Sequence, residues 1–541
     1  MHVVDGRNAS MLSESSCIMD LTRKDFLALS GRAAAGATAL GAWGLLGPEA
    51  APAMDVLGSP EVRKVHEAIA RSKVDHIRKI QEDLRQPSVS SWNQGIQEMA
   101  GRMMAHFKAI GCREVSLVKT DGLPGVFAHY DCGAPKTISV YMMYDTQPFD
   151  ETRWSSPPLE ARLVKMEPFE QVVMARGAVN DKGPNRMFLN ALESILEVHG
   201  RLPVNIMFTC DGEEEQGSPH FHQVLEPYND RLKTCNAHLS AGPHQDKSGG
   251  VSMALGSKGI LYLEIEASGS RWGRGPQKRP IHSSRKAILD SPVWRLVQAL
   301  RTLYDPAADR ILVPGYLEAI RPPSDEEEEL IRALTTRFKG RLFGSERENT
   351  KVWMKDWTEE EAARHLMFDT TLNIDGIWAG YTGPGSATIL PEKATVKLDS
   401  RLVPDQEIAV QKRLILDHLS KGGFDDLEVR QLGGGDEWSQ TSVHQPVVQA
   451  VLSVYKRYGL EPQIWPRHAG SSPEYQYTRK LGLPAASGGL GHGGRAHSDD
   501  EYLVIEGNAL VAGIVRAEQA IVDILYGYAS WPEPRAAIKR G

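Results

Sequence analysis

Residues 204–218 have the sequence VNIMFTCDGEEEQGS, in which a cluster of acids directly follows an apolar stretch. The stretch from Val204 to Phe208 is typical of a strand that is buried on both faces of a sheet. Two adjacent carboxylates, Glu214 and Glu215, come after its end. Ligand sites of open α/β sheets lie beyond the carboxyl ends of the strands. We therefore expect one of these acids to act as a general base and the other as a metal ligand. An exposed acidic turn is the alternative interpretation.

Strand and helix patterns alternate on both sides of this stretch. Three segments show apolar residues at helical spacing, and three others have the composition of strands. The helical segments are 60–85, 92–110 and 187–199, and the strands are 115–120, 126–131 and 137–145. Such alternation predicts an α/β fold in which a mostly parallel sheet carries helices on both faces.

A smaller second domain is predicted after residue 256. Its segments read as strands with one exposed face (259–268, 394–404 and 426–432) and as helices (292–303 and 408–419). An acidic run over 324–330 favours a solvated helix start rather than a binding surface. The buried pattern returns after residue 435, with helices expected over 447–458 and 508–526.

The length of 541 residues exceeds what one core supports, so more than one domain is expected. We predict four parts. They are an export segment (1–53), the first part of the main domain (54–256), an inserted α+β lid or dimerisation domain (257–434) and the second part of the main domain (435–541).

Charge and cysteine content exclude several classes of function. The net charge is −7, which offers no surface for phosphates, so we expect no nucleic-acid partner. The five cysteines include no CxxC pair, so neither a thiolate zinc site nor a disulfide framework is indicated. One disulfide bridge stays open at this point. Beyond the N-terminal segment no run of about 18 apolar residues occurs, so no membrane span is expected.

The N-terminal segment has the three regions of a secretory signal. Arg23 and Lys24 precede a small and apolar run over 33–46, which ends before Ala51-Pro52-Ala53. TRKDFL resembles a twin-arginine export motif, so a periplasmic location is predicted. A cytoplasmic protein with an amphipathic or unfolded extension is the alternative.

Two further motifs accompany the acidic one, VYMMYDTQP (140–148) and RGAVNDKG (176–183). In order and spacing the three resemble the aminoacylase, carnosine dipeptidase and carboxypeptidase G family of two-zinc peptidases, which includes acetylornithine deacetylase and succinyl-diaminopimelate desuccinylase. The resemblance extends over about 60–525. It implies a zinc-peptidase-like main domain, an inserted lid, a homodimer, and hydrolysis of an amide bond in a dipeptide or an N-acyl amino acid.

The resemblance also identifies the metal-ligand positions, and several are substituted. One metal of the family would use Met143, Asn180 and Ala241, where the family has histidine, aspartate and a further carboxylate. A thioether is a poor ligand for zinc. The other metal would use Asn180, Glu215 and His497, of which two are strong ligands. We therefore expect at most one zinc or other divalent metal per chain, and no metal is the alternative. His244, Asp181 or the substrate would complete the shell, and Asp246 also lies near Ala241 in sequence.

Catalytic and substrate-binding roles follow from the same resemblance. Glu214 occupies the general-base position, and Asp145 stands on the strand that precedes it. His282 matches the histidine that reaches across a dimer to polarise the scissile carbonyl. The substrate-binding candidates are Asn373, Arg401, Arg467 and Ser471. A guanidinium suits a terminal carboxylate, because it donates two parallel hydrogen bonds. For each arginine, a surface or interdomain ion pair is the alternative.

The leading hypothesis is an amidohydrolase with Glu214 as its base. The second hypothesis keeps the fold without metal, either as an enzyme with altered chemistry that uses Glu214 and Asp145 as an acid-base pair, or as a silent binding protein. A third is a periplasmic ligand-binding protein with two α/β lobes. The insertion of one domain inside the other disfavours it, because such lobes lie side by side. The glycine-rich stretch over 488–497 does not join a strand to a helix as phosphate loops do, and we interpret it as flexible backbone around His497.

Overall fold

The computed structural model describes residues 55–343, 350 and 352–532. The predicted export segment, residues 1–53, lies outside these residues. Within the described ranges, no helix has both the length and the apolarity that a membrane crossing requires.

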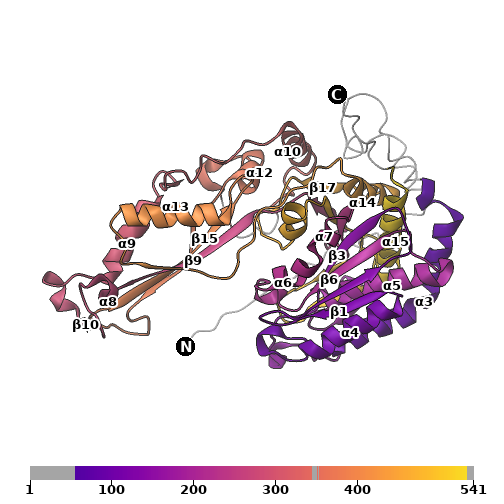
Figure 1. Ribbon diagram of the computed structural model, residues 1–541, viewed down its shortest axis with the longest axis horizontal. Helices are drawn as coiled ribbons and strands as arrows, with labels where there is room; N and C mark the ends of the chain where they lie inside the picture. The colour runs from indigo at the N-terminus through magenta and orange to yellow at the C-terminus, as the bar shows by residue number, and fades with distance from the viewer. Residues whose placement is uncertain (1–54, 344–349, 351, 533–541) are drawn as a thin grey trace, which may run out of the picture. The chain divides into compact units, whose positions relative to one another are not determined.

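A six-stranded sheet forms the centre of the main domain (Figure 1). Its strands lie in the order β1-β2-β6-β3-β7-β18, and β3 pairs in parallel with both β6 and β7, as β18 does with β7. The predicted mostly parallel α/β sheet is therefore confirmed. The strands are β1 (Glu114–Val118), β2 (Gly125–Tyr130), β3 (Thr137–Met143), β6 (Asn205–Asp211), β7 (Ala237–Ala241) and β18 (Ala485–Gly488).

Alternate strand residues face two separate cores, as the period of two requires. Ile206 and Phe208 of β6 belong to a large core shared with α3 (Pro60–Arg85), α4 (Ile96–Ala109), α5 (Lys182–His199), α14 (Pro446–Arg457) and α15 (Ile514–Ser530). Met207, between them, faces the opposite side and packs with α6 (Phe221–Leu225) and α7 (Asn229–Leu232). Both faces of the sheet are thus covered, which holds the strand ends rigidly.

Local sequence signals set the helix ends. Pro60 occupies the first position of α3, and the Ser59 hydroxyl accepts a hydrogen bond from the N–H of Val62. Helix α5 begins five residues before the predicted start, because its first turn is buried by the surrounding structure rather than marked by apolar residues. Helix α15 begins at Ile514 instead of residue 508, since the Asn508 side chain accepts the N–H groups of Leu510 and Val511 and forms a turn there.

A four-stranded antiparallel sheet lies within the predicted insertion. Its order is β13 (Asn373–Ala379), β15 (Lys393–Leu402), β9 (Gly259–Ser268) and β16 (Glu428–Gln431). One face packs against α9 (Pro292–Leu303) and α13 (Ile408–Lys421) around a separate core (Figure 1). The strict alternation of buried and half-buried residues along β9 matches its sequence pattern. The domain limits at residues 256 and 434 stay a prediction.

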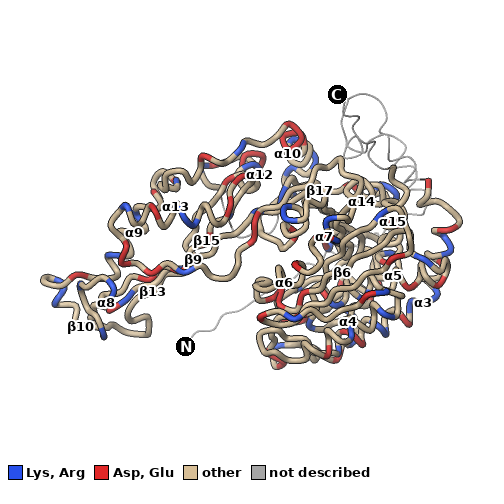
Figure 2. The backbone as a smooth tube through the Cα atoms, in the orientation of Figure 1, with Lys and Arg blue, Asp and Glu red and all other residues tan. Residues whose placement is uncertain are grey.

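The acidic run over 324–330 forms the start of a helix, as predicted. Helix α10 (Asp325–Arg337) is capped by Ser324 and Glu327 in a reciprocal capping box. Glu327 is nevertheless buried, where it meets Arg321 and Arg467. Helix α12 (Glu359–Phe368) packs beside α10. Figure 2 shows basic and acidic residues interspersed along the chain.

A second four-stranded sheet was not predicted, with the order β19-β20-β5-β4. Its strands are β4 (Arg162–Met166), β5 (Phe169–Met174), β19 (Gly493–Gly494) and β20 (Tyr502–Glu506). The shorter elements are α8 (Gly269–Trp272), β8 (Val251–Ala254), β10 (Ile281–His282), β11 (Tyr304–Asp305), β12 (Arg310–Ile311), β14 (Ile389–Leu390) and β17 (Pro462–Trp465). The cysteines of the described part, Cys112, Cys132, Cys210 and Cys235, are all free, so the disulfide left open above is absent among them.

Candidate active site

The ends of β3 and β6 bring the first two motifs of the site together. Met143 pairs with Asp211 in the parallel register, so the residues after both strands emerge side by side. The Asp145 carboxylate accepts hydrogen bonds from the backbone N–H groups of Glu214 and Glu215, each at 3.1 Å. Asp145 is completely buried, and this burial raises its pKa to about 7. The geometry therefore makes Asp145 a positioning residue for the turn that carries the two glutamates.

Asn180, Glu215 and His497 converge on one point from three separate segments. The Asn180 Nδ2 lies 2.7 Å from Glu215 Oε1 and 3.0 Å from His497 Nε2. His497 Nε2 lies 3.1 Å from the second carboxylate oxygen of Glu215. The side chain of Glu215 is almost fully buried, whereas that of His497 is 58% exposed. The three candidate ligands are thus adjacent, with one side open to solvent.

Glu214 is half-buried beside this group, at the start of a short 3-10 helix (Glu214–Gln216). In the described part of the chain its carboxylate has no hydrogen-bond partner. Burial raises its pKa to about 8, with a further contribution from the neighbouring carboxylates of Glu215 and Asp145. Clustered buried acids disfavour one another's charged forms, and a nearby cation reverses that effect. The composition of the site therefore favours a positively charged occupant.

A cavity of about 150 Å³ lies between the ends of β3 and β7 and the first turn of α5. Ala241, the position that corresponds to a carboxylate ligand in the resemblance, lines it, and so do Asp181 and His244. Met143 is buried, and its carbonyl accepts a hydrogen bond from the Asn185 side chain. Asp181 thus lies on this cavity, and it is close enough to Glu214 and Glu215 for the charges of these acids to oppose one another. Asp246 accepts hydrogen bonds from Ser248 and Gly250 in a surface turn and does not line the cavity.

Asn180, Glu215 and His497 are the adjacent residues that could hold a divalent cation. Among the described residues, no group of three or more His, Cys, Asp or Glu side chains is arranged to hold a metal. Glu215 and His497 provide one carboxylate and one imidazole, and the Asn180 amide adds a neutral oxygen when turned about its last torsion. Zinc sites with catalytic roles have three protein ligands and an open position. These three residues can supply that set once.

Glu501 organises the loop that carries Asn180, and the sequence reasoning missed it. Its carboxylate accepts hydrogen bonds from the backbone N–H groups of Gly177, Val179 and Asn180, at 2.9 to 3.1 Å. Arg176 donates to the same carboxylate at 2.7 Å, and both side chains are buried. Glu501 is the last acid of the cluster that follows His497, so its position was a usable signal.

Gln147 was also missed. Its amide nitrogen donates to Glu215 Oε2 at 2.8 Å and so holds the carboxylate of that candidate ligand. Gln147 is part of the first family-like motif, two residues after Asp145. Motif membership was the available signal.

The glycine-rich stretch before His497 is closely packed, contrary to the flexible backbone that we expected. Gly489 has a φ of 142°, and a Cβ atom there would lie 2.3 Å from the carbonyl oxygen of Gly242. At Gly493 an added Cβ would lie 2.4 Å from Val179. Gly489 is needed because a backbone segment approaches it, and Gly493 because the Val179 side chain packs against it.

His282 and Asn373 make local contacts only, within the described part of the chain. The two ring nitrogens of His282 lie 2.8 Å from Ser284 Oγ and 3.1 Å from Thr388 Oγ1, and the residue is exposed. The Asn373 amide donates to Asp375 at 2.8 Å from an exposed position. Both belong to the predicted insertion and leave their outer faces available.

The two candidate arginines differ in accessibility. Arg401 is half-buried, and its Nε donates to Asp399 at 3.0 Å. Arg467 is completely buried, pairs with Glu327 at 2.5 Å and lies over the ring of Phe368. Burial lowers the pKa of Arg467 to about 10. The ion-pair alternative is therefore the arrangement found for Arg467.

Ser471 is half-buried, and its hydroxyl hydrogen-bonds the Asp436 carboxylate. Burial raises the pKa of Asp436, and this hydrogen bond opposes the rise. Ser471 is thus engaged by an acid of its own chain.

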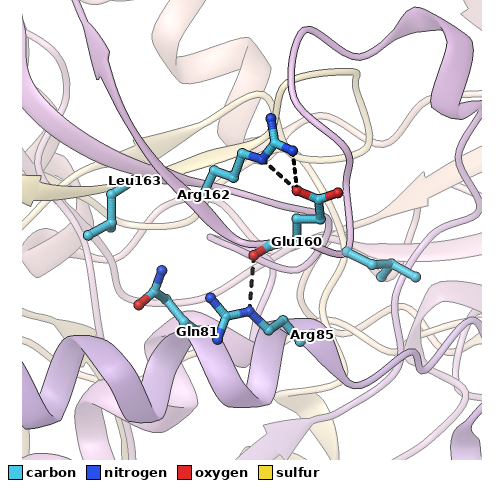
Figure 3. Close-up of a pocket in the computed structure, with 6 residues that line it drawn as sticks. Gln81, Arg85, Glu160, Arg162 and Leu163 are labelled. Atoms are coloured by element: carbon cyan, nitrogen blue, oxygen red, sulfur yellow. Dashed lines mark hydrogen bonds and ion pairs between the residues drawn. The ribbon is translucent and has the colours of Figure 1, made fainter.

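A hollow of about 660 Å³ is lined by Gln81, Arg85, Leu159, Glu160, Arg162 and Leu163 (Figure 3). There, Arg162 pairs with the Glu160 side chain, and Arg85 donates to the Glu160 carbonyl. None of the candidate catalytic or metal-binding residues lines this hollow.

Comparison with known proteins assigns this arrangement to a group of peptidases. A model described as peptidase family M20/M25/M40 matches residues 141–522. The Cys-Gly metallodipeptidase of Candida albicans is 23% identical over 469 residues, which cover 82% of this chain and 93% of that protein. The human Beta-Ala-His dipeptidase is 27% identical over 339 residues, which cover 61% of this chain and 63% of that protein.

Solved structures give the same result. An M20 family metallo-carboxypeptidase from Sulfolobus solfataricus superimposes with a TM-score of 0.72 at 30% identity, over 84% of this chain and 98% of that one. Human carnosine dipeptidase 1 superimposes with a TM-score of 0.66 at 22% identity, over 87% of this chain and 99% of that one. The match at 22% identity shows the shared fold alone.

Proposed function

Because this chain belongs to peptidase family M20/M25/M40 and is a hydrolase of peptide bonds, we propose that it cleaves dipeptides or N-acyl amino acids with at most one divalent metal per chain. The observation that carries the proposal is the convergence of Asn180, Glu215 and His497 beside the unengaged carboxylate of Glu214. The relatives named as metallodipeptidases and dipeptidases support the substrate class.

In the proposed mechanism Glu214 takes a proton from the attacking water and returns it to the leaving amine. Asp145 keeps the backbone of Glu214 and Glu215 in place, and Glu501 keeps the Asn180 loop in place. A divalent cation held by Glu215, His497 and Asn180 would polarise the scissile carbonyl. Hydrogen-bond donors such as His282 would share the charge of the oxyanion.

Arg401 is the proposed partner of the substrate carboxylate. Its guanidinium is partly exposed, and the hydrogen bond from its Nε to Asp399 leaves its terminal nitrogens as donors for a second carboxylate. Asn373 pairs with Asp399 in the strand register, so it lies on the neighbouring strand. Ser471 and Arg467 complete the proposed set, although Arg467 would first have to exchange the carboxylate of Glu327.

Metal analysis of the purified enzyme tests the count directly. We expect about one equivalent of zinc or another divalent metal per chain, because one site keeps a carboxylate and an imidazole while the other has lost its ligands. Activity on a panel of dipeptides and N-acyl amino acids should fall on chelation and return on adding one equivalent of metal. Two equivalents per chain would contradict the proposal.

A metal-independent enzyme is the second candidate, and one observation favours it. The Asn180 amide hydrogen-bonds Glu215 and lies beside His497, so the three side chains satisfy one another without a cation. An enzyme of this kind would keep full activity after exhaustive chelation and would contain no metal. A chain that binds dipeptides without cleaving them would be a silent homologue.

We also propose a homodimer formed through β13. In the described part of the chain this strand is an edge of the four-stranded sheet, and Ile374, Ile377 and Trp378 on it are 48%, 52% and 44% exposed. An exposed edge strand with apolar side chains is ready to pair with another strand. Among the described residues the His282 ring contacts Ser284 and Thr388 of the same predicted insertion, and it is exposed, which supports a role at the site of a second copy.

Light scattering after size exclusion checks the dimer. We expect the Ile377→Asp variant to be monomeric at concentrations where the wild type is dimeric, because a charge on the paired edge opposes association. Val74→Asp is the matched control, since Val74 is 79% exposed on α3. A monomeric wild type, or a dimer that Ile377→Asp leaves unchanged, would contradict this interface.

Export to the periplasm is proposed from residues 1–53 alone. Charged, apolar and small-residue regions follow one another there in the order of a secretory signal. Cell fractionation with N-terminal sequencing of the mature protein tests it: a cytoplasmic protein that keeps its first 53 residues would contradict the proposal.

A further inference from the structure

The cavity beside Ala241 carries an inference about the substrate, and it rests on the proposed function. We propose that this cavity binds the free ammonium group of a dipeptide, so that the substrate supplies a positive charge beside Ala241 and Asp181. The enzyme would then be selective for dipeptides with a free amino group over N-acyl amino acids.

Asp181 is the acidic residue among the side chains that line the cavity. It lines the cavity, it is half-buried, and in the described part of the chain its carboxylate has no hydrogen bond or ion pair. Asp181 is also the residue that precedes α5, where an aspartate normally accepts a helix N–H group, yet no such bond is present. Burial raises the pKa of Asp181 to about 7, and a cationic ligand in the cavity would lower this pKa and favour the charged carboxylate.

Asn185 and His244 add two hydrogen-bond acceptors to the carboxyl group of Asp181 on the cavity. The Asn185 amide nitrogen donates to the carbonyl of Met143 at 2.7 Å, which leaves its oxygen to accept. His244 Nδ1 lies 3.1 Å from the carbonyl of Gly242 and therefore carries the proton, so Nε2 is an acceptor. Burial lowers the pKa of His244, which keeps the ring neutral. A carboxylate, an amide oxygen and an imidazole nitrogen match the three N–H donors of an ammonium group.

Size and position also favour a small cation. The volume of about 150 Å³ admits an amino group with its short stem. Asp181 follows Asn180, which contacts Glu215 directly. An ammonium group in the cavity would therefore lie next to the scissile bond, which is attacked by the water that Glu214 deprotonates. Ala241 leaves room for this group, because only a methyl side chain borders the cavity there.

The test compares each dipeptide that is hydrolysed with its N-acetyl derivative, for the wild type and for Asp181→Asn. We expect the wild type to prefer the free dipeptide by about tenfold or more in kcat/KM. Asp181→Asn should lower kcat/KM for the free dipeptide by roughly 10- to 100-fold, as expected for a lost charge-assisted hydrogen bond. The N-acetyl derivative should change by less than about threefold.

Asp246→Asn is the matched control, because Asp246 lies in a surface turn outside the cavity and asparagine keeps its turn hydrogen bonds. It should leave both substrates unaffected. Asp181→Asn should bind as much metal as the wild type and unfold at the same temperature or higher, since it removes an unpaired carboxylate. Loss of metal from Asp181→Asn, or an equal loss of activity on both substrates, would overturn the proposal.

Cleavage and binding measurements together show whether this inference or the proposed function has failed. If N-acyl amino acids alone are cleaved, the proposed function stands and this inference falls. If nothing is cleaved, calorimetric titration of alanyl-glycine and N-acetyl-alanyl-glycine decides. Tighter binding of the free amine that Asp181→Asn abolishes supports the ammonium site, and equal binding of the two rejects it.

Discussion

Replacing Glu214 with glutamine should lower kcat by about a hundredfold or more while KM for the same dipeptide stays within a few-fold. Glutamine keeps the size of the side chain but cannot accept a proton from water. The Glu214 carboxylate has no hydrogen-bond partner in the described part of the chain, so its loss removes chemistry rather than packing. Steady-state kinetics under substrate saturation measures the effect.

Glu213→Gln is the control for this experiment. Glu213 is the preceding acid, but its carboxylate accepts the N–H of Leu123 at 2.9 Å and lies 2.8 Å from His220 Nδ1. It is thus directed to a different set of partners, and its replacement should change kcat by less than about fivefold. A Glu214→Gln enzyme that keeps more than a tenth of wild-type kcat would exclude Glu214 as the base.

Replacing Glu501 with alanine should destabilise the main domain by about 3–5 kcal/mol. The change leaves the buried Arg176 guanidinium without its carboxylate and removes the acceptor of three backbone N–H groups. It also releases the loop that holds Asn180, so metal content should fall together with stability. Urea unfolding followed by tryptophan fluorescence, with metal analysis of the same sample, measures both.

Asp499→Ala is the matched control in the same acidic cluster. Asp499 pairs with Arg153 at 2.8 Å, but the Arg153 side chain is 69% exposed. Exposed ion pairs contribute about 0–1 kcal/mol because solvent screens them. If Glu501→Ala lowers the free energy of unfolding by no more than Asp499→Ala does, the buried ion pair of Glu501 with Arg176 does not order the loop that carries Asn180.

Two elements with a clear periodicity were predicted to the residue, whereas the starts of α5 and α15 were not. Strand β9 and helix α9 begin and end where the sequence pattern places them, because an alternating or helical apolar pattern specifies one face. The small sheet of β4, β5, β19 and β20 was missed. It joins segments more than 300 residues apart, and neither half shows its partner in the local sequence.

The sequence predicted which residues form the candidate site, but it did not predict the hydrogen bonds and ion pairs that these residues make. The motifs identified Glu214, Glu215, Asn180 and His497, since spacing along strand ends brings such residues to one edge of a sheet. The spacing of residues along the sequence does not determine which partner a carboxylate side chain contacts. The ion pair of Arg467 with Glu327, and the engagement of Asp145 by two backbone N–H groups, depend on chain segments that meet only after folding.

The amino-acid order was thus sufficient for the α/β class and the main strand ends, because both depend on local pattern. The free carboxylate of Asp181 on a cavity beside Ala241, and the hold of Glu501 on the Asn180 loop, required the folded chain. The reason is physical: which polar group a buried acid meets depends on the packing of distant segments, and local periodicity does not encode it.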